Sequence, residues 1–322
     1  MSLAPWLLPV WARFAQGLVS GRMPHALLIG GDSGLGKRAL VEAMVASLLC
    51  PKRGADGHAC GRCRACQWRV AGSHPDLFKL SIDEEATQIR IEQIRNLNAR
   101  LSLSAQPDAW QVAVIDPADK MNHNAANALL KTLEEPSAAS VLILVSDHPQ
   151  QLLATIRSRC QVLKIVEPSV AQARTWLVAQ GLEGAAAEVA LTLAHGNPGL
   201  AAHFATPAQQ QLFDATLREL TGFLTGRVGL AEIGANWAKD RPLERLDWLS
   251  RALAVAVCRP FNSTPIGLEG VARLARHAEP LALSLWWEQL GRTRALLATP
   301  VRNDLLLIEC LARARQVFRI AA

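Results

Sequence analysis

The sequence lacks long hydrophobic runs and long runs of like charge. Its longest charge-free stretch, about Val189 to Phe213, contains glycine, proline, histidine and glutamine, which excludes a membrane-spanning helix there. The apolar start, MSLAPWLLPVWAR, lacks the preceding basic residues of a signal peptide. Internal repeats and low-complexity tracts are also not evident. These absences predict a cytoplasmic protein with no membrane partner.

The composition is that of a folded protein. Half of the 322 residues are hydrophobic and 19% are charged, which favours a large core over general disorder. The length suggests about two domains. The net charge of +6 is spread along the chain. Such a charge permits contact with nucleic acid, and it is equally typical of a solvated basic surface.

The first half of the chain alternates short β-rich runs with helical patterns. Strands are predicted at 25–30, 76–82, 110–116, 140–146 and 161–166, and helices at 37–49, 89–101, 122–135 and 149–159. Because these strands are almost continuously apolar and helices separate them, we expect an α/β fold with a parallel sheet covered on both faces. The pattern leaves the order of the strands open.

Strand patterns almost vanish after Pro168, and helical patterns continue to the end of the chain. We therefore predict three domains. An α/β domain spans residues 1–167, a small all-α domain spans 168–206, and an all-α bundle spans 207–322.

Four of the seven cysteines form one cluster. Cys50, Cys60, Cys63 and Cys66 follow the spacing C-x9-C-x2-C-x2-C, which in a chain without a secretion signal favours a metal over disulfides. Four thiolates suit Zn²⁺ and leave no open position, so the predicted zinc is structural and stabilises a module at about 50–75. An iron–sulfur cluster is the main alternative, although the short, arginine-rich loop would shield such a cluster poorly from water.

The segment GGDSGLGKRA is an imperfect phosphate-binding loop. Gly31, Gly36 and Lys37 fit the spacing G-x-x-x-x-G-K, with Gly34 between them, after a predicted strand and before a predicted helix. Backbone amides and Lys37 could still bind phosphate groups there. The next residue should be Ser or Thr, whose hydroxyl binds Mg²⁺, but it is Arg38, and a guanidinium has no acceptor.

Two further motifs make the chain recognisable. The segments NALLKTLEEP (127–136) and TIRSRC (155–160), with the cysteine spacing and the broken loop, resemble the AAA+ clamp-loader family, and within it the delta-prime subunits of bacterial DNA polymerase III. The resemblance covers the whole chain and is strongest over 1–167. It implies a RecA-like AAA+ domain with a zinc module, a helical lid at 168–206 and a helical collar at 207–322.

The resemblance also implies partners. The collar would bind motor subunits of the gamma/tau type and a delta-type subunit, and the assembled complex would meet primed DNA and, indirectly, the sliding clamp.

Compared with the ATP-hydrolysing members of that family, three groups are missing. Arg38 replaces the magnesium-binding hydroxyl, Pro117 follows Asp116 where a water-polarising Glu is usual, and Gly199 stands where the lid carries an Arg. Ser146 matches their phosphate-sensing Thr. Each missing group normally contributes to the electrostatics of phosphoryl transfer. We therefore predict weak or no ATP binding and no intrinsic ATPase activity, within a complex that forms part of the DNA polymerase III holoenzyme.

The resemblance assigns roles to the SRC motif and to two polar residues. Arg159 would be an arginine finger that completes the nucleotide site of a neighbouring subunit, with Ser158 positioning the turn. The alternative for Arg159 is a surface arginine paired with a nearby carboxylate. Lys131 and Thr155 match positions where clamp-loader relatives approach the template backbone, and Lys131 fits a surface lysine equally well.

Two other functions remain open at this stage. The chain could be an active motor-type ATPase with a divergent loop, because it keeps Gly36 and Lys37. It could also be a zinc-dependent nucleic-acid-binding protein, because the segment KRGADGHACGRCRAC is basic. ATP turnover by the isolated chain would identify the former, and salt-dependent DNA binding by the chain alone would identify the latter.

Overall fold

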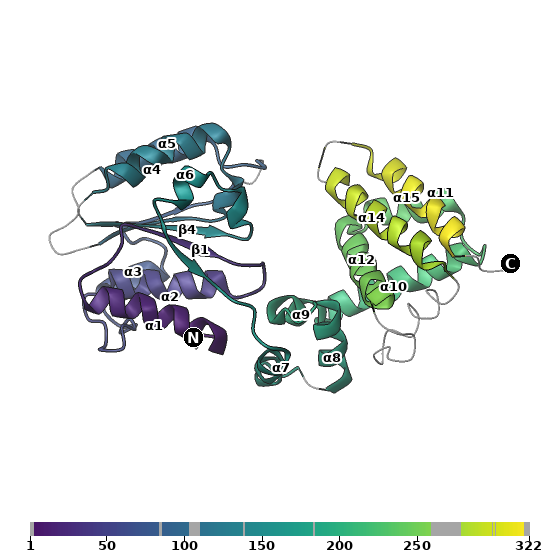
Figure 1. The fold of residues 1–322 in the computed structure, drawn as a ribbon, viewed down its shortest axis with the longest axis horizontal. Helices are drawn as coiled ribbons and strands as arrows, with labels where there is room; N and C mark the ends of the chain where they lie inside the picture. Colours follow the sequence, from purple (N-terminus) through teal and green to yellow (C-terminus); the bar gives the residue numbers. More distant parts are fainter. Residues whose placement is uncertain are drawn as a thin grey trace. The chain divides into compact units, whose positions relative to one another are not determined.

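The computed structural model describes residues 3–83, 86–102, 110–137, 139–182, 184–258, 278–297, 299 and 301–318. The chain forms two compact units, Met1–Pro168 and Ser169–Ala322 (Figure 1). Among the described residues, no helix is both long and apolar enough to cross a membrane.

The first unit is built on a five-stranded parallel sheet. The strands are β1 (Ala26–Gly30), β2 (Leu77–Leu80), β3 (Gln111–Ile115), β4 (Ser140–Ser146) and β5 (Gln161–Lys164), in the order β2-β3-β4-β1-β5. Every residue of β1, β3 and β4 is buried, which is why these segments are apolar on both faces. The predicted parallel α/β sheet is confirmed.

Helices cover both faces of this sheet (Figure 1). One face carries α4 (Ile91–Leu101), α5 (His123–Glu134) and α6 (Ala154–Arg157), and the other carries α1 (Leu8–Val19) and α2 (Lys37–Leu49). Alternate strand residues such as Leu28, Ala113 and Leu144 pack in one core with Ile94 and Leu129 of the helices.

Three local features of this unit differ from the sequence-based expectation. The predicted helix at 149–159 is a 3₁₀ turn, η3 (Pro149–Gln151), followed by the single turn of α6, because Leu152 and Leu153 are extended. Leu152 is buried in the sheet–helix core, so packing interrupts the helical pattern. Helices α1 and α3 (Arg64–Val70) were not predicted.

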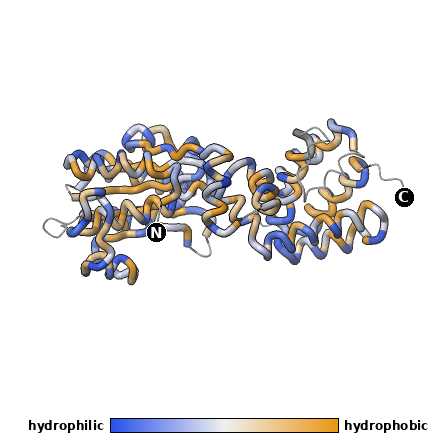
Figure 2. Tube along the Cα trace, turned by 90° about the horizontal axis from the view of Figure 1, so that it is seen from below, coloured by the Kyte–Doolittle hydropathy of each residue, from blue (hydrophilic) through white to orange (hydrophobic). Residues whose placement is uncertain are grey.

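The second unit consists of helices in its described part. They are α7 (Val170–Ala179), α8 (Gly184–Leu193), α9 (Pro198–Phe204), α10 (Pro207–Leu224), α11 (Leu230–Lys239), α12 (Pro242–Cys258), α14 (Pro280–Leu297) and α15 (Asn303–Val317). Along them apolar and polar stretches alternate, as expected for helices that bury one face (Figure 2).

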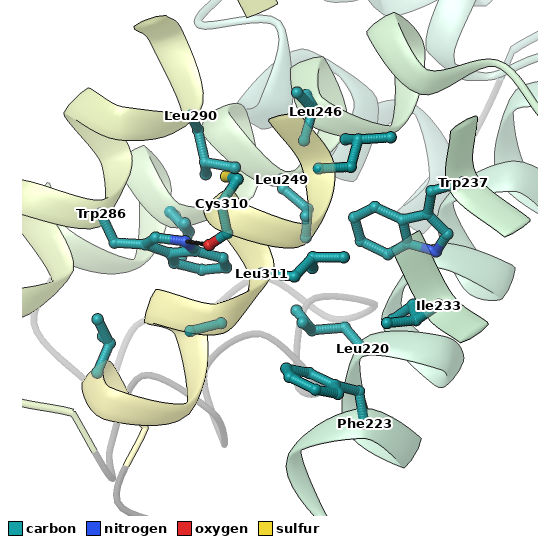
Figure 3. Packing of buried hydrophobic residues seen from close by; sticks show 14 of the residues in the cluster. Leu220, Phe223, Ile233, Trp237, Leu246, Leu249, Trp286, Leu290, Cys310 and Leu311 are labelled. Atoms are coloured by element: carbon teal, nitrogen blue, oxygen red, sulfur yellow. Dashed lines mark hydrogen bonds between the residues drawn. The ribbon is translucent and has the colours of Figure 1, made fainter. Parts of the chain in front are cut away.

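The helical unit has two apolar cores. Helices α7 to α9 pack around Leu177 and Phe204, together with Trp248 of α12. The later helices pack around Trp237 and Trp286 (Figure 3). The indole nitrogen of Trp286 donates a hydrogen bond to the Cys310 carbonyl at 3.0 Å, so the large ring is buried without leaving its polar atom unpaired (Figure 3). The fully buried Trp237 donates to Glu219 at 2.6 Å.

Candidate functional site

The carboxyl ends of the central strands bring the phosphate-loop residues together. Gly30, the last residue of β1, pairs with Ser146 at the end of β4, and Asp116 directly follows β3. The loop after β1 leads into α2 at Lys37. Gly31 has a φ of +152°, and a Cβ there would lie 2.9 Å from the Ile165 carbonyl, so this position requires glycine. Parallel strands thus set the loop beside the acidic ends of their neighbours.

Lys37 is enclosed by its own loop. Its side chain is only 4% exposed. The ammonium donates to the carbonyls of Gly31 at 2.5 Å and Asp32 at 2.6 Å, and forms an ion pair with Asp147 at 2.5 Å. An ammonium has three donors, and these three partners engage all of them. No donor of Lys37 is therefore left for a phosphate in this conformation.

Arg38, which stands where the loop motif carries a magnesium-binding hydroxyl, pairs with Asp116 at two points. Its Nε donates to Asp116 Oδ2 at 2.6 Å and its Nη2 donates to Asp116 Oδ1 at 3.1 Å. This two-point hydrogen bond is the main reason that the pKa of Arg38 is raised. The guanidinium engages both oxygens of Asp116, although the Arg38 side chain is 65% exposed.

The surroundings of the loop are acidic. Four carboxylates lie around it, those of Asp32, Asp116, Asp147 and Glu167. Burial and a hydrogen bond with Asp32 raise the pKa of Glu167. The Ser146 hydroxyl donates to Asp119 at 2.6 Å, so the residue at the phosphate-sensing position also bonds within the chain. Such surroundings oppose the binding of a polyphosphate anion.

The apolar N-terminal segment also contacts the loop, a role that its sequence did not indicate. In η1 (Pro5–Leu7), the indole nitrogen of Trp6 donates to the Leu35 carbonyl at 2.9 Å. A Cβ added at Gly36 would lie 3.1 Å from Leu7. The apolar start of the chain therefore packs on the loop, and its burial is the physical reason for its apolar composition.

The SRC motif forms the turn between α6 and β5. Arg159 is half-buried, and its guanidinium donates to the Thr155 carbonyl at 3.0 Å and pairs with Glu134 of α5 at 2.7 Å. The Ser158 hydroxyl donates to the same Thr155 carbonyl at 3.1 Å. Burial raises the pKa of Cys160 to about 11, so this thiol stays protonated and packs in the core. The ion pair between Arg159 and Glu134 thus joins the SRC motif to α5, the LLKTLEEP helix.

The two candidate DNA contacts are exposed and lie on different helices. Lys131 is on α5, one turn before Glu134, and Thr155 is on α6. Gly199 lies in α9, in the second unit, and offers no side chain.

The four clustered cysteines converge in space. Cys50 follows the last residue of α2, Cys63 precedes α3 and Cys66 lies on it. All four sulfur atoms lie within 4.8 Å of one another, with Cys50 Sγ 3.6 Å from Cys60 Sγ and 3.9 Å from Cys63 Sγ. Tetrahedral Zn²⁺ with bonds of about 2.3 Å requires sulfur separations of about 3.8 Å. The geometry of the cluster therefore fits a metal ion of this size and preference.

The cysteine loop is held to the sheet unit from two sides. His58 stacks on Trp11 of α1, with ring centroids 4.3 Å apart. The buried Ser47 hydroxyl donates to the Gly57 carbonyl, and Gly57 has a φ of +79°. Backbone amides of Arg62 and Cys63 lower the pKa of Cys60 to about 6, whereas burial raises the pKa of Cys50 and raises that of Cys66 to about 12.

Comparison with known proteins agrees with this arrangement. The profile of the family described as "DNA polymerase III, delta subunit" matches residues 8–169. The DNA polymerase III subunit delta' of Pseudomonas aeruginosa is 38% identical, with 95% of each chain covered. The subunit delta' of Escherichia coli is 32% identical, covering 96% of this chain and 94% of the relative.

Two further similarities extend to other subunits. The DNA polymerase III subunit tau of Salmonella typhimurium is 32% identical over 51% of this chain and 25% of the relative. The solved structure of a DNA polymerase III gamma subunit-related protein from Thermotoga maritima aligns with a TM-score of 0.50 and 18% identity, over 96% of this chain and 99% of that one. This structure supports the AAA+ fold. The delta' matches along nearly the whole length show that the chain belongs to the delta-prime family of DNA polymerase III clamp-loader subunits.

Proposed function

We propose that the chain is a non-hydrolysing subunit of the clamp loader, in which its own side chains fill the nucleotide loop. The observation that carries this proposal is the pairing of both loop cations: Lys37 with Asp147 and Arg38 with Asp116. A nucleotide would have to displace these partners, and Mg²⁺ would have to displace Arg38 from Asp116. Pro117 and Gly199 remove two further groups on which hydrolysis depends.

The proposed contribution to ATP hydrolysis is made in trans through Arg159. Its partners are the exposed carboxylate of Glu134 and a backbone carbonyl. Exposed ion pairs of this kind contribute about 0–1 kcal/mol, so the guanidinium can exchange Glu134 for the γ-phosphate held by a neighbouring motor subunit. A guanidinium there stabilises charge as the phosphate bond breaks. Ser158 supports the turn through its bond to Thr155.

The remaining proposals concern assembly. Residues 168–206 act as a lid and residues 207–322 as a collar that binds gamma/tau-type and delta-type subunits. Lys131 and Thr155 contribute at most auxiliary contacts to primed DNA in the complex, and the sliding clamp is engaged indirectly. Cys50, Cys60, Cys63 and Cys66 hold a structural Zn²⁺, which links the end of α2 to α3.

The proposal is tested by ATP binding and turnover of the isolated chain. We expect no turnover above background and weak or no binding, unchanged in Lys37→Ala. Appreciable turnover that Lys37→Ala abolishes would contradict the proposal and would identify an active motor-type ATPase.

A further inference from the structure

The outer edge of β2 has backbone groups without a strand partner. The Asp76 carbonyl accepts from the Val112 amide at 2.8 Å, and the Leu80 carbonyl accepts from the Asp116 amide at 3.0 Å. In a parallel ladder alternate residues face the neighbouring strand, so the amide and carbonyl of Lys79 face away from β3. Among the described residues no strand pairs with this edge.

The edge borders a groove with a volume of about 490 Å³. Residues of three elements line it: β2 itself, α3 through Arg69, and α4 through Asn96 and Arg100. Helices α3 and α4 lie on opposite sides of the sheet (Figure 1), so the groove follows the sheet edge between them. The groove therefore has walls on both sides of an unpaired strand, which is the geometry that an added strand requires.

The charges of the groove are only partly compensated. Arg69 and Lys79 share one carboxylate, that of Glu42 on α2. The Nε of Arg69 is buried and has no hydrogen-bond partner. Arg100 forms no ion pair within the described parts of the chain, and its guanidinium lies 5.9 Å from the Phe78 ring.

The groove also holds one acidic side chain. Asp83 lies at one end and accepts a hydrogen bond from Gln93 at 3.0 Å. Three cations thus meet two carboxylates, and Arg100 has no ion-pair partner among the described residues.

We propose that an extended acidic peptide segment of a partner protein binds this edge as an added strand. Its backbone bonds to the outward amide and carbonyl of Lys79, and its carboxylates reach Arg69 and Arg100. At about 3.3 Å per residue, the four residues of β2 accommodate a segment of roughly four to five residues. A lysine on a strand edge also discourages unspecific pairing with other strands.

The probe for this inference is a fluorescein-labelled heptapeptide of alternating valine and glutamate, whose binding to the full chain is followed by fluorescence anisotropy. Two matched peptides separate the contribution of the negative charges from that of the backbone hydrogen bonds. One carries lysine in place of glutamate, and the other is N-methylated at alternate amides, which removes strand hydrogen bonds. We expect only the unmodified acidic peptide to bind and to slow amide exchange at residues 77–81.

Variants of the chain assign the contacts. Arg100→Gln should weaken binding roughly two- to fivefold, as expected for an exposed charge pair, whereas Arg95→Gln on the same helix outside the groove should leave it unchanged. Lys79→Pro removes the outward amide, which an edge strand tolerates, and should weaken binding roughly 2- to 10-fold more than Lys79→Ala, which keeps that amide.

Four results would overturn the inference. They are equal binding of the lysine or N-methylated peptide, equal effects of the Arg95 and Arg100 variants, absence of binding at roughly 1 mM peptide, or displacement of the peptide by single-stranded DNA through the same residues. The last result would identify a nucleic-acid site instead. Because the isolated chain is the binding partner, none of these outcomes depends on the proposed role in ATP hydrolysis.

Discussion

The loop after β1 and the turn before β5 both present cations suited to phosphate, but they hold them differently. In the loop, Lys37 is 4% exposed and bonded three times within the chain, and Arg38 is bonded at two points to Asp116. In the turn, Arg159 is 36% exposed and meets one exposed carboxylate. Lys37, which is buried and paired, stabilises its own fold, whereas the more exposed Arg159 with its weakly held partner can be recruited by another molecule. The comparison supports the proposal of a subunit that does not hydrolyse ATP at its own loop and that contributes Arg159 to the nucleotide site of a neighbour.

Removal of Arg159 should have the largest effect. In a reconstituted clamp loader, Arg159→Ala should lower DNA-stimulated ATP hydrolysis at the adjoining motor site by roughly 10³-fold, because the charge of the transition state loses its cation. Steady-state hydrolysis and clamp loading measure this, with assembly checked by gel filtration. Arg157→Ala, which changes an exposed arginine two residues away, is the control. Equal, small effects of both variants would reduce the contribution of the chain to scaffolding.

Loss of the proposed zinc should loosen the cysteine module and leave the loop after β1 and the turn before β5 intact. Cys63→Ser should abolish stoichiometric zinc in elemental analysis and increase amide exchange over residues 50–75, because three thiolates no longer close the site. Exchange in the helical unit should not change. Cys160→Ala, at a packed cysteine outside the cluster, should retain the metal. Iron in the native protein, or no metal at all, would refute the zinc prediction.

Replacement of Arg38 should raise the affinity of the loop for nucleotide without restoring ATP hydrolysis. Arg38→Thr frees Asp116 and supplies a hydroxyl, so Mg-ATP affinity should rise by about tenfold, which corresponds to about 1.4 kcal/mol. Turnover should stay at background, because Pro117 and Gly199 remain. Isothermal titration and a phosphate-release assay test the two halves of this prediction. Turnover in this single variant would show that Arg38 alone blocks the site.

Release of Arg159 from its partner should have a smaller effect. Glu134→Gln removes an exposed ion pair, so hydrolysis at the adjoining site of the complex should rise by up to about fivefold. The same assay as for Arg159→Ala applies. If hydrolysis instead falls as far as in that variant, Glu134 positions the arginine rather than competing for it.

The smallest effect is expected at Lys131. Lys131→Ala in the assembled complex should weaken binding to primed DNA by roughly two- to threefold and reduce the salt dependence by about one phosphate contact. Titrations at several salt concentrations measure both quantities, with the exposed Lys120 changed to Ala as the control. Unchanged binding across salt would show that Lys131 is a surface lysine without a DNA contact.

Local sequence pattern was sufficient to predict some of the helices and strands. The predicted helix at 37–49 and the predicted strand at 140–146 have the same bounds in the structure. The helix has an uninterrupted helical period and the strand is a continuous apolar run, both with clear ends. Neighbouring residues alone therefore specify these two segments. The helix predicted at 149–159 is interrupted at Leu152 and Leu153, where the backbone is extended and Leu152 is buried in the core. A short helical pattern does not reveal such a tertiary requirement.

The sequence by itself determined the fold class, the cysteine spacing and the family motifs, because these depend on residue type and on distances along the chain. Only the tertiary structure decided the order of the strands and hence which carboxylates meet the loop. Arg38 and Asp116 are 78 residues apart, and they meet because β1, β3 and β4 end at one edge of the sheet. The sequence indicates that a magnesium-binding hydroxyl is missing. That an ion pair occupies its place follows from the register of parallel strands, which long-range packing sets.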